Sequence, residues 1–138
     1  MKAYKATYDG KGRDITYEVG KIYNLTHGKL EMCERGFHFC KTIKDLTLWY
    51  NFIQDNKFNE DIKVFEIEAL GKIIENPDKC ISNKIKIVKE LDREEILEFI
   101  KYIYKFDENN NMIQEKYPNG DIKKYKYDKN NNLIQEKF

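Results

Sequence analysis

The 138-residue sequence contains few residues of four kinds: three cysteines, two prolines, two histidines and one tryptophan. No two cysteines form a CxxC pair, and an odd count does not suit a disulfide framework, so we expect Cys33, Cys40 and Cys80 to be reduced thiols. No run approaches the roughly 18 apolar residues of a membrane helix, and the opening MKAYKATYDG lacks the apolar segment of a secretion signal. We therefore expect a cytoplasmic protein.

The sequence also lacks an excess of either charge, because 25 lysine and arginine residues face 24 aspartate and glutamate residues. A net charge of +1 produces no overall field that would attract nucleic acid or a membrane. Hydrophobic residues make up 41% of the chain, which is enough to bury the core of one modest domain with an appendage.

Short segments of alternating polarity predict a mostly antiparallel sheet. The clearest is the run from Ile62 to Leu70, where Phe65, Ile67 and Ala69 share one face and Val64 lies on the other. Gly71 allows a bend directly after it. We expect strands over residues 2–8, 15–19, 21–25, 29–33, 37–40, 62–70, 72–75 and 84–91, and a loop over residues 55–61.

Residues 35–50, RGFHFCKTIKDLTLWY, predict a strand that leads into an amphipathic helix. Alternation places Phe37 and Phe39 on one strand face and His38 and Cys40 on the other. Apolar residues then recur at helical spacing after Thr42, a suitable N-cap, and these are Ile43, Leu46, Trp49 (or Tyr50) and Ile53. We expect Phe39 and Trp49 to lie in the core.

A second helix is predicted from Arg93 to about Lys101. Asp92 is a good N-cap, and Glu94 and Glu95 in the first turn are favoured by the helix dipole.

The end of the chain contains a repeat. KFDENNNMIQEKY (105–117) recurs as KYDKNNNLIQEKF (126–138), 21 residues further on. Asp-x-Asn-Asn-Asn and Pro-Asn-Gly-Asp supply turn residues, so these segments predict an antiparallel meander of about four strands. The expected fold is α+β, with a mostly antiparallel sheet and two helices over residues 1–103 and a β-meander appendage over residues 104–138.

Residues 1 to about 91 resemble an uncharacterised domain of phage and prophage proteins. The matching motifs are YKATYDGKGRDITYEVGKIY, ERGFHFCKTIKDLTLWYN, VFEIEALGKI and NKIKIVKEL. This resemblance implies phage origin, and hence the cytoplasm of a host cell, but no chemistry.

The tail resembles two short copies of the Tyr-Asp repeat of Rhs-type and wall-associated proteins, with Phe106-Asp107 and Tyr127-Asp128 at the signature pair. In large members this repeat curls into a β-shell, and two copies are too few to enclose anything.

Two kinds of cysteine chemistry can be considered. His27, Cys33, His38 and Cys40 follow the pattern H-x5-C-x4-H-x-C, which lacks the tight pair of ligands of a structural zinc site, so we expect no metal and no cofactor. A Cys-His nucleophile would pair Cys40 or Cys33 with His38 or His27. Of these, His38 and Cys40 share a strand face but lie about 7 Å apart along a regular strand, too far for a direct hydrogen bond. Buried structural thiols are the simpler interpretation.

An enzymatic alternative comes from a second, weaker resemblance. A first strand, a Gly-aromatic strand leading into a helix, and a Glu-bearing strand faintly resemble the ADP-ribosyltransferase core. The resemblance implies a site at Tyr4 or Lys5, His38, and Glu66 or Glu68. The family's usual first-strand Arg or His is missing, and so is its Ser-Thr-Ser motif.

We therefore expect a non-enzymatic protein-binding module of phage origin that blocks a host protein, such as an anti-CRISPR inhibitor of a defence nuclease. An ADP-ribosyltransferase-like enzyme is the alternative, and a self-associating module with an open sheet edge is a further one. The expected contact residues are Tyr117, Tyr125 and Tyr127, with Lys124 and Lys126 on the opposite face as the rim.

Two other interpretations of the tail remain open. The tyrosines can instead cover the domain core. Lysines interleaved with tyrosines can also bind nucleic acid, with bases stacked on the rings. Nucleic acid is not favoured, because Glu115, Asp121, Asp128 and Glu136 surround these lysines and cancel their field.

Overall fold

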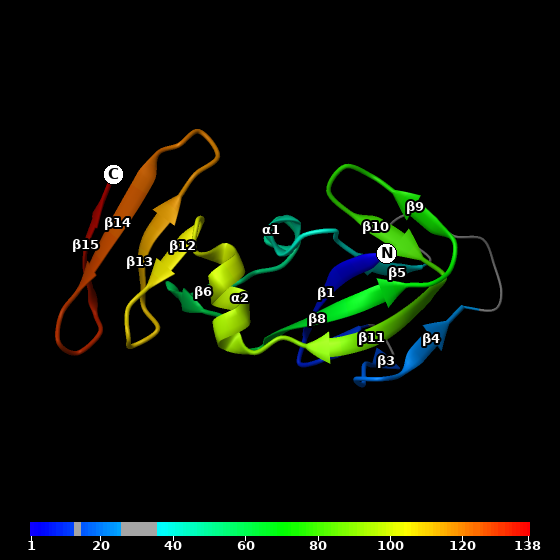
Figure 1. Ribbon diagram of the computed structural model, residues 1–138. Coiled ribbons are helices and arrows are strands. Elements are labelled where there is room, and N and C mark those ends of the chain that lie inside the picture. The colour runs from blue at the N-terminus through cyan, green and yellow to red at the C-terminus, as the bar shows by residue number, and fades with distance from the viewer. Residues whose placement is uncertain (13–14, 26–35) are drawn as a thin grey trace.

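The computed structural model describes residues 1–12, 15–25 and 36–138. The strand expected over residues 29–33, together with His27 and Cys33, lies outside the described residues. The fold is mostly antiparallel β-sheet with two helices and a separate sheet at the C-terminal end (Figure 1). Among the described residues, neither helix is long and apolar enough to cross a membrane.

A six-stranded antiparallel sheet forms the centre of the fold, in the order β3-β2-β1-β8-β11-β4. Its strands are β1 (Lys2–Tyr8), β2 (Lys11–Gly12), β3 (Ile15–Thr16), β4 (Ile22–Asn24), β8 (Ile62–Ala69) and β11 (Lys84–Glu90). The two longest neighbours, β1 and β8, pair from Lys2–Glu68 to Tyr8–Ile62. The long strands agree with the sequence prediction, whereas β3 and β4 are shorter than expected.

Both faces of this sheet are covered. On one face, Phe65 and Ile67 of β8 pack with Phe37 and Phe39. On the other face, Val64 joins a second cluster with residues from the two helices. Phe39 is 2% exposed, which confirms its predicted place in the core.

A three-stranded sheet, in the order β5-β10-β9, continues from the central one. It consists of β5 (Phe37–Phe39), β9 (Ile73–Glu75) and β10 (Cys80–Ser82), of which β10 was not predicted. The chain bends at Gly71 between β8 and β9, as expected. Reciprocal 2.8 Å backbone hydrogen bonds between Tyr4 and Cys40 join β1 to the end of β5.

The first helix is much shorter than predicted. Helix α1 spans only Ile43–Leu46, with Thr42 as its N-cap. It ends at Thr47, whose hydroxyl donates to the carbonyl of Lys44 at 2.6 Å. Because the helix does not continue, Trp49 does not follow the buried face and is 48% exposed. The prediction that Trp49 is buried was therefore wrong.

The segment predicted as a loop over residues 55–61 contributes to a small hairpin. Strands β6 (Ile53–Gln54) and β7 (Lys57–Phe58) pair around Asp55 and Asn56. Both turn residues have positive φ, 53° and 61°. This is the geometry of a tight two-residue hairpin turn, which Asp and Asn tolerate.

Helix α2 spans Arg93–Ile100, as predicted. Asp92 accepts a 2.8 Å hydrogen bond from the backbone N–H of Glu95, and the Glu95 carboxylate accepts one from the backbone N–H of Asp92 at 3.2 Å. These reciprocal bonds form a capping box. The helix buries Ile96 and Ile100 in the same cluster as Val64.

The tail forms its own four-stranded sheet, in chain order β12-β13-β14-β15. The strands are β12 (Tyr104–Phe106), β13 (Met112–Lys116), β14 (Ile122–Tyr127) and β15 (Leu133–Lys137), which confirms the predicted meander. This sheet lies at one end of the molecule, beside α2 and β6 (Figure 1). Phe106 packs edge-on against Phe58 of β7, with ring centroids 6.0 Å apart. The division into domains at residues 103 and 104 stays a prediction.

Candidate functional site

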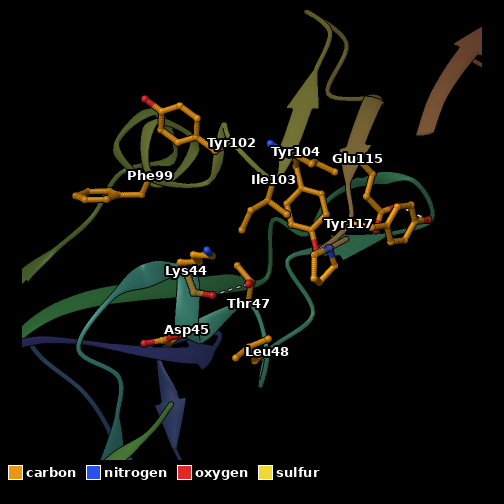
Figure 2. Close-up of a pocket in the computed structure, with 12 residues that line it drawn as sticks. Lys44, Asp45, Thr47, Leu48, Phe99, Tyr102, Ile103, Tyr104, Glu115 and Tyr117 are labelled. Atoms are coloured by element: carbon orange, nitrogen blue, oxygen red, sulfur yellow. Dashed lines mark hydrogen bonds between the residues drawn. The ribbon is translucent and has the colours of Figure 1, made fainter. Parts of the chain in front are cut away.

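A cavity of about 690 Å³ lies between α1, the C-terminal end of α2 and the first hairpin of the tail (Figure 2). We call it the tail groove. It is lined by Lys44, Asp45, Thr47, Leu48, Phe99, Tyr102, Ile103, Tyr104, Glu115, Lys116, Tyr117 and Pro118. Three parts of the chain that are distant in sequence therefore form one concave surface.

Three large apolar side chains at this groove are open to solvent. Leu48 is 64% exposed, Phe99 is 50% exposed and Tyr102 is 76% exposed. A single exposed apolar residue is ordinary, but several gathered in one concave surface mark a contact site. Sequence reasoning missed all three. The available signal was that Phe99 and Tyr102 lie off the Ile96–Ile100 face of the second helix.

The tail side of the groove is held by a shared carboxylate. The Tyr117 hydroxyl donates to Oε2 of Glu115 at 3.3 Å, and the Tyr125 hydroxyl donates to the same oxygen at 3.0 Å. Burial, followed by the nearby charge of Glu115, raises the pKa of Tyr104. Burial and the bond to Glu115 also raise the pKa of Tyr125. These phenols stay protonated at neutral pH, which suits contact rather than proton transfer.

The predicted contact tyrosines divide into different roles. Tyr117 is half-buried and lines the tail groove. Tyr125 is only 6% exposed, so the expectation that its ring is open to a partner was wrong. Tyr127 is half-buried and donates a 2.7 Å hydrogen bond to the carbonyl of Met112, which fixes it across the sheet. Lys124 and Lys126 are exposed on the opposite face, as expected, and their role in binding stays a prediction.

A smaller cavity of about 230 Å³ is lined by His38 and Phe39 of β5 and by Cys40, which follows this strand. The Cys40 thiol donates to the carbonyl of Asp78 at 3.3 Å, and so does the Trp49 indole N–H at 3.3 Å. Burial, followed by nearby acidic groups, raises the pKa of Cys40 to about 12. A thiol with this pKa is protonated at neutral pH, so Cys40 is poorly suited to act as a nucleophile. The Lys79 ammonium lies 4.3 Å from the centre of the Trp49 ring.

Residues 1–12, 15–25 and 36–138 contain no cluster of three or more His, Cys, Asp or Glu side chains that could hold a metal ion. The buried thiol of Cys40 lies in the core cluster that contains Val64, and the buried thiol of Cys80 lies in the cluster that contains Phe65. His27 and Cys33 lie outside the described residues.

The residues implied by the ADP-ribosyltransferase resemblance lie on adjacent strands. Tyr4 is directly opposite Glu66 in the β1–β8 register, and the Lys5 ammonium donates to the carbonyl of His38 at 2.7 Å. Both glutamates are held in ion pairs, Glu66 with a lysine at 3.3 Å and Glu68 with the N-terminal ammonium at 2.6 Å. His38 lines the 230 Å³ cavity, but neither glutamate does.

The two Asp-x-Asn-Asn-Asn loops have the same hydrogen bonds. In the first loop, Asp107 Oδ1 accepts from the backbone N–H groups of Asn109 and Asn111, both at 2.9 Å. In the second loop, 21 residues later, Asp128 Oδ1 accepts from the equivalent pair, also at 2.9 Å. In each loop the middle asparagine has positive φ, 66° at Asn110 and 63° at Asn131.

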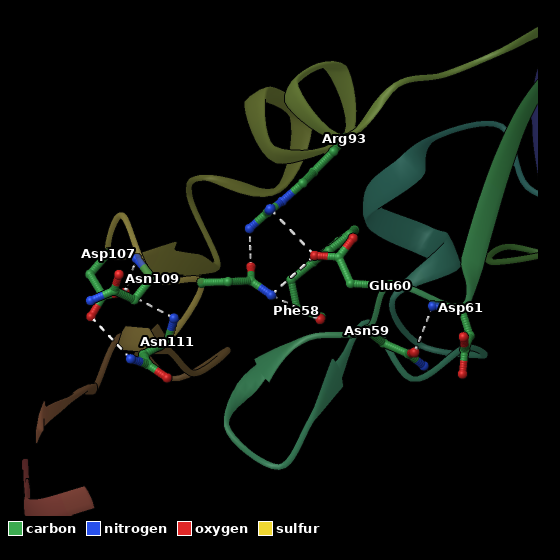
Figure 3. A network of polar contacts seen from close by, with 9 residues as sticks. Phe58, Asn59, Glu60, Asp61, Arg93, Asp107, Asn109 and Asn111 are labelled. Carbon is green, nitrogen blue, oxygen red and sulfur yellow. Dashed lines mark hydrogen bonds and ion pairs between the residues drawn. The ribbon is translucent and has the colours of Figure 1, made fainter. Parts of the chain in front are cut away.

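The first loop docks the tail onto the rest of the chain (Figure 3). The Asn110 side chain donates to the carbonyl of Phe58 at 3.3 Å and accepts from Arg93, which also pairs with Glu60 at 3.3 Å. In the second loop, Asn131 Oδ1 instead accepts from the side chain of Asn111 at 3.0 Å. The first loop therefore contacts β7 and α2, and the second loop contacts the first.

Comparison with known proteins gives a family for the larger part of the chain. Residues 1–99 match the model of a family described as a domain of unknown function (DUF7666). No curated protein and no solved structure matches the chain. The match includes the central sheet and nearly all of helix α2, and it ends before the tail sheet begins at Tyr104. The chain therefore belongs to the DUF7666 family of domains of unknown function.

Proposed function

We propose that this chain is a non-enzymatic protein-binding module and that the tail groove is its main contact surface. In this proposal the protein is phage-derived and inhibits a host defence effector, such as a CRISPR nuclease, by occupying part of its surface. The target class rests on the resemblance of residues 1–91 to phage and prophage proteins. The Tyr-Asp-type repeat supplies the outer wall of the groove.

The observation that carries the proposal is the set of exposed apolar side chains at the groove, Leu48, Phe99 and Tyr102. Complete burial of one such side chain contributes about 1.5–3 kcal/mol. Tyr also ranks among the residues that most often dominate binding energy, because it adds apolar area and a polar tip at little entropic cost. Half-buried Tyr117 lies in the same groove and extends this surface onto the tail.

The test uses variants that remove the exposed anchors without touching the core. Leu48→Ala/Tyr102→Ala is compared with Val19→Ala/Ile22→Ala, whose side chains are also more than half exposed, 55% and 53%, but do not line the groove. The protein is first used to capture a partner from an extract of infected or lysogenic host cells. The partner is then purified, and its affinity and enzymatic activity are measured with each variant.

We expect the groove variant to weaken binding by at least tenfold and to relieve inhibition of the partner, while the matched variant behaves as the unchanged protein. Equal binding by both variants overturns the groove as the contact surface. A partner that binds tightly but keeps full activity overturns inhibition.

The enzymatic alternative has one supporting observation, the placement of Tyr4 directly opposite Glu66 on neighbouring strands. It predicts an NAD-dependent mass increase on a host protein that is lost in Glu66→Gln. Intact-mass measurement after incubation with NAD and host extract decides this point. No mass increase removes the enzymatic alternative.

The self-association alternative is supported by β15, the outermost strand of the tail sheet, in which every residue is exposed. Unpaired backbone groups on such an edge pair readily with another strand. Light scattering over a range of protein concentrations tests this. A monomer at every concentration removes the alternative.

A further inference from the structure

The four-stranded tail sheet separates its charges onto two faces. Cross-strand register and alternation place Lys105, Lys116, Lys124, Lys126 and Lys137 on one face, which we call the lysine face. The two strand glutamates, Glu115 and Glu136, lie on the other face with Tyr125. The acidic strand residues therefore do not neutralise the lysine face, although the chain as a whole is nearly neutral.

The repeat itself produces this separation. Each copy contains Gln-Glu-Lys in its second strand, at residues 114–116 and 135–137. In a strand, the glutamine and lysine point to one side and the glutamate points to the other. The Glu and Lys of each Gln-Glu-Lys segment balance in charge along the chain, but the strand separates them. The tail sheet therefore has one basic face and one face with charges of both signs.

The lysines on this face are close to one another and exposed. Lys105 is opposite Gln114, Gln114 is opposite Lys124, and Lys124 is directly opposite Lys137. Like charges directly opposite each other destabilise a strand pair. None of the five lysines forms an ion pair with a described residue, whereas Lys123 on the other face pairs with Glu136 at 3.6 Å. An anion bound over this face would relieve the repulsion.

We propose that the lysine face binds the phosphate backbone of a nucleic acid without reading its sequence. Outward side chains lie about 6.6–6.8 Å apart along a strand, and neighbouring strands lie about 4.8 Å apart, so several ammonium groups reach successive phosphates. Gln114 and Gln135 add hydrogen-bond donors for phosphate oxygens on the same face.

Two observations favour phosphate over the other polyanions. Among the regularly paired residues of the described tail sheet, Ile122 is the large apolar side chain on this face, and exposed Ile113 and Ile134 lie at the two register shifts, where alternation assigns no face. Protein interfaces are depleted in lysine, so an acidic protein fits this lysine-rich face poorly. Tyr125 and Tyr127 lie on the opposite face, so among the described strand residues of the tail no tyrosine ring lies beside these lysines to stack on a base. Contact in this proposal is therefore confined to the backbone of the nucleic acid.

The test measures the salt dependence of DNA binding. A fluorescently labelled 20-base-pair duplex DNA is titrated with the full chain at several salt concentrations, and binding is followed by anisotropy. We expect a dissociation constant on the order of 10⁻⁶ to 10⁻⁴ M and, for four to five phosphate contacts, a slope of log affinity against log salt of about −4.

The variant K124Q/K126Q/K137Q should make that slope shallower, from about −4 to about −1 to −2, and weaken binding at least tenfold at low salt. The matched control K57Q/K72Q/K86Q removes the same charge from exposed positions elsewhere and should leave the slope unchanged. Thermal melting checks the folding of both. If the triple variant does not fold, the single variants Lys105→Gln and Lys126→Gln are used, each of which should reduce the magnitude of the slope by about one.

Several outcomes overturn the proposal. One is no binding of duplex DNA at low salt, and another is an equal loss of binding by the face and control variants. Competition by polyglutamate as strong as that by unlabelled DNA indicates an acidic protein surface instead. Binding to phosphatidylserine vesicles without binding to DNA indicates a membrane surface.

Discussion

Gly71 and Asn83 face each other where the long β8–β11 hairpin bends, and a β-carbon on Gly71 would overlap the Oδ1 atom of Asn83. The same oxygen accepts a 2.9 Å hydrogen bond from the backbone N–H of Lys72. A β-carbon at position 71 would also lie 2.9 Å from the β-carbon of Lys84, which is part of the neighbouring strand. The close approach of two strands therefore explains glycine at this bend.

The first prediction is that Gly71→Ala lowers the free energy of unfolding by about 1–3 kcal/mol, because the bend must open to admit the methyl group. Urea denaturation measures the change. The double variant Gly71→Ala/Asn83→Ala should lose less than the sum of the two single variants, since removing the Asn83 side chain relieves the overlap. Strictly additive losses would contradict this explanation.

The second prediction compares two aromatic residues of the central segment. Phe39→Ala should lower the free energy of unfolding by about 3–5 kcal/mol, because Phe39 is 2% exposed. Trp49→Ala should cost only about 1–2 kcal/mol, since Trp49 is 48% exposed and loses one hydrogen bond and one contact with the Lys79 ammonium. Similar losses at both positions would place Trp49 in the core after all.

The third prediction uses the two repeat loops as matched controls. Asn110→Ala and Asn131→Ala both place alanine at positive φ, which costs about 1 kcal/mol at each site. Asn110→Ala also removes the bonds to Phe58 and Arg93, whereas Asn131→Ala removes one bond from Asn111, so the total loss at Asn110 should be greater by one hydrogen bond, about 1 kcal/mol. Chemical denaturation of each variant measures the difference, and a larger loss at Asn131 would mean that the first loop does not dock the tail.

The fourth prediction concerns thiol reactivity. In a Cys33→Ser background, iodoacetamide at pH 8 should modify Cys40 and Cys80 only as fast as the protein unfolds, because both thiols are buried and burial raises the pKa of each. Mass spectrometry follows the modification, with urea-unfolded protein as the control. Rapid modification of native Cys40 would reopen its assignment as a nucleophile.

The raised pKa of Cys40 also predicts a pH dependence. The folded-state pKa of about 12 lies above the ordinary value of 9.0, so the folded state favours the protonated thiol. The stabilising contribution is complete below about pH 9 and is lost as the pH rises toward 12. The free energy of unfolding should therefore fall over this range, and Cys40→Ala should fall less steeply than the unchanged protein. Parallel curves would contradict the shift.

The sequence was enough to predict an element where its structure depends on residues close together in the chain. The strands around Ala3 and Phe65 follow from alternation, helix α2 follows from Asp92 and the apolar spacing behind it, and the tail meander follows from its Asp-Asn turns. Gly71 was predicted to allow a bend, although the overlap with Asn83 appears only once the two strands are placed together.

The prediction of the first helix failed because apolar spacing did not show where the helix ends. Apolar spacing from Ile43 to Ile53 predicted one helix, but the chain ends it at Leu46 and uses Ile53 in a hairpin. Periodicity counts apolar positions, and it does not distinguish a helix face from a short helix followed by an extended segment.

The tail groove likewise combines a residue that the sequence indicated with residues that only the folded structure brings together. Tyr117 was chosen from the repeat in the sequence and lines the tail groove, but Leu48, Phe99 and Tyr102 come from other elements and meet only in the folded chain. Their exposure depends on which side chains the two helices leave uncovered, which is a property of packing and not of any local pattern.

The sequence by itself determined the repeat, its turns and the alternation of Gln, Glu and Lys, because these depend on residues close together in the chain. Only the tertiary structure decided that Tyr125 is buried, with its hydroxyl on Glu115, and that Lys124 lies opposite Lys137 on an exposed face. Alternation separates side chains onto two faces, but which face is covered depends on the strands and helices that pack against it.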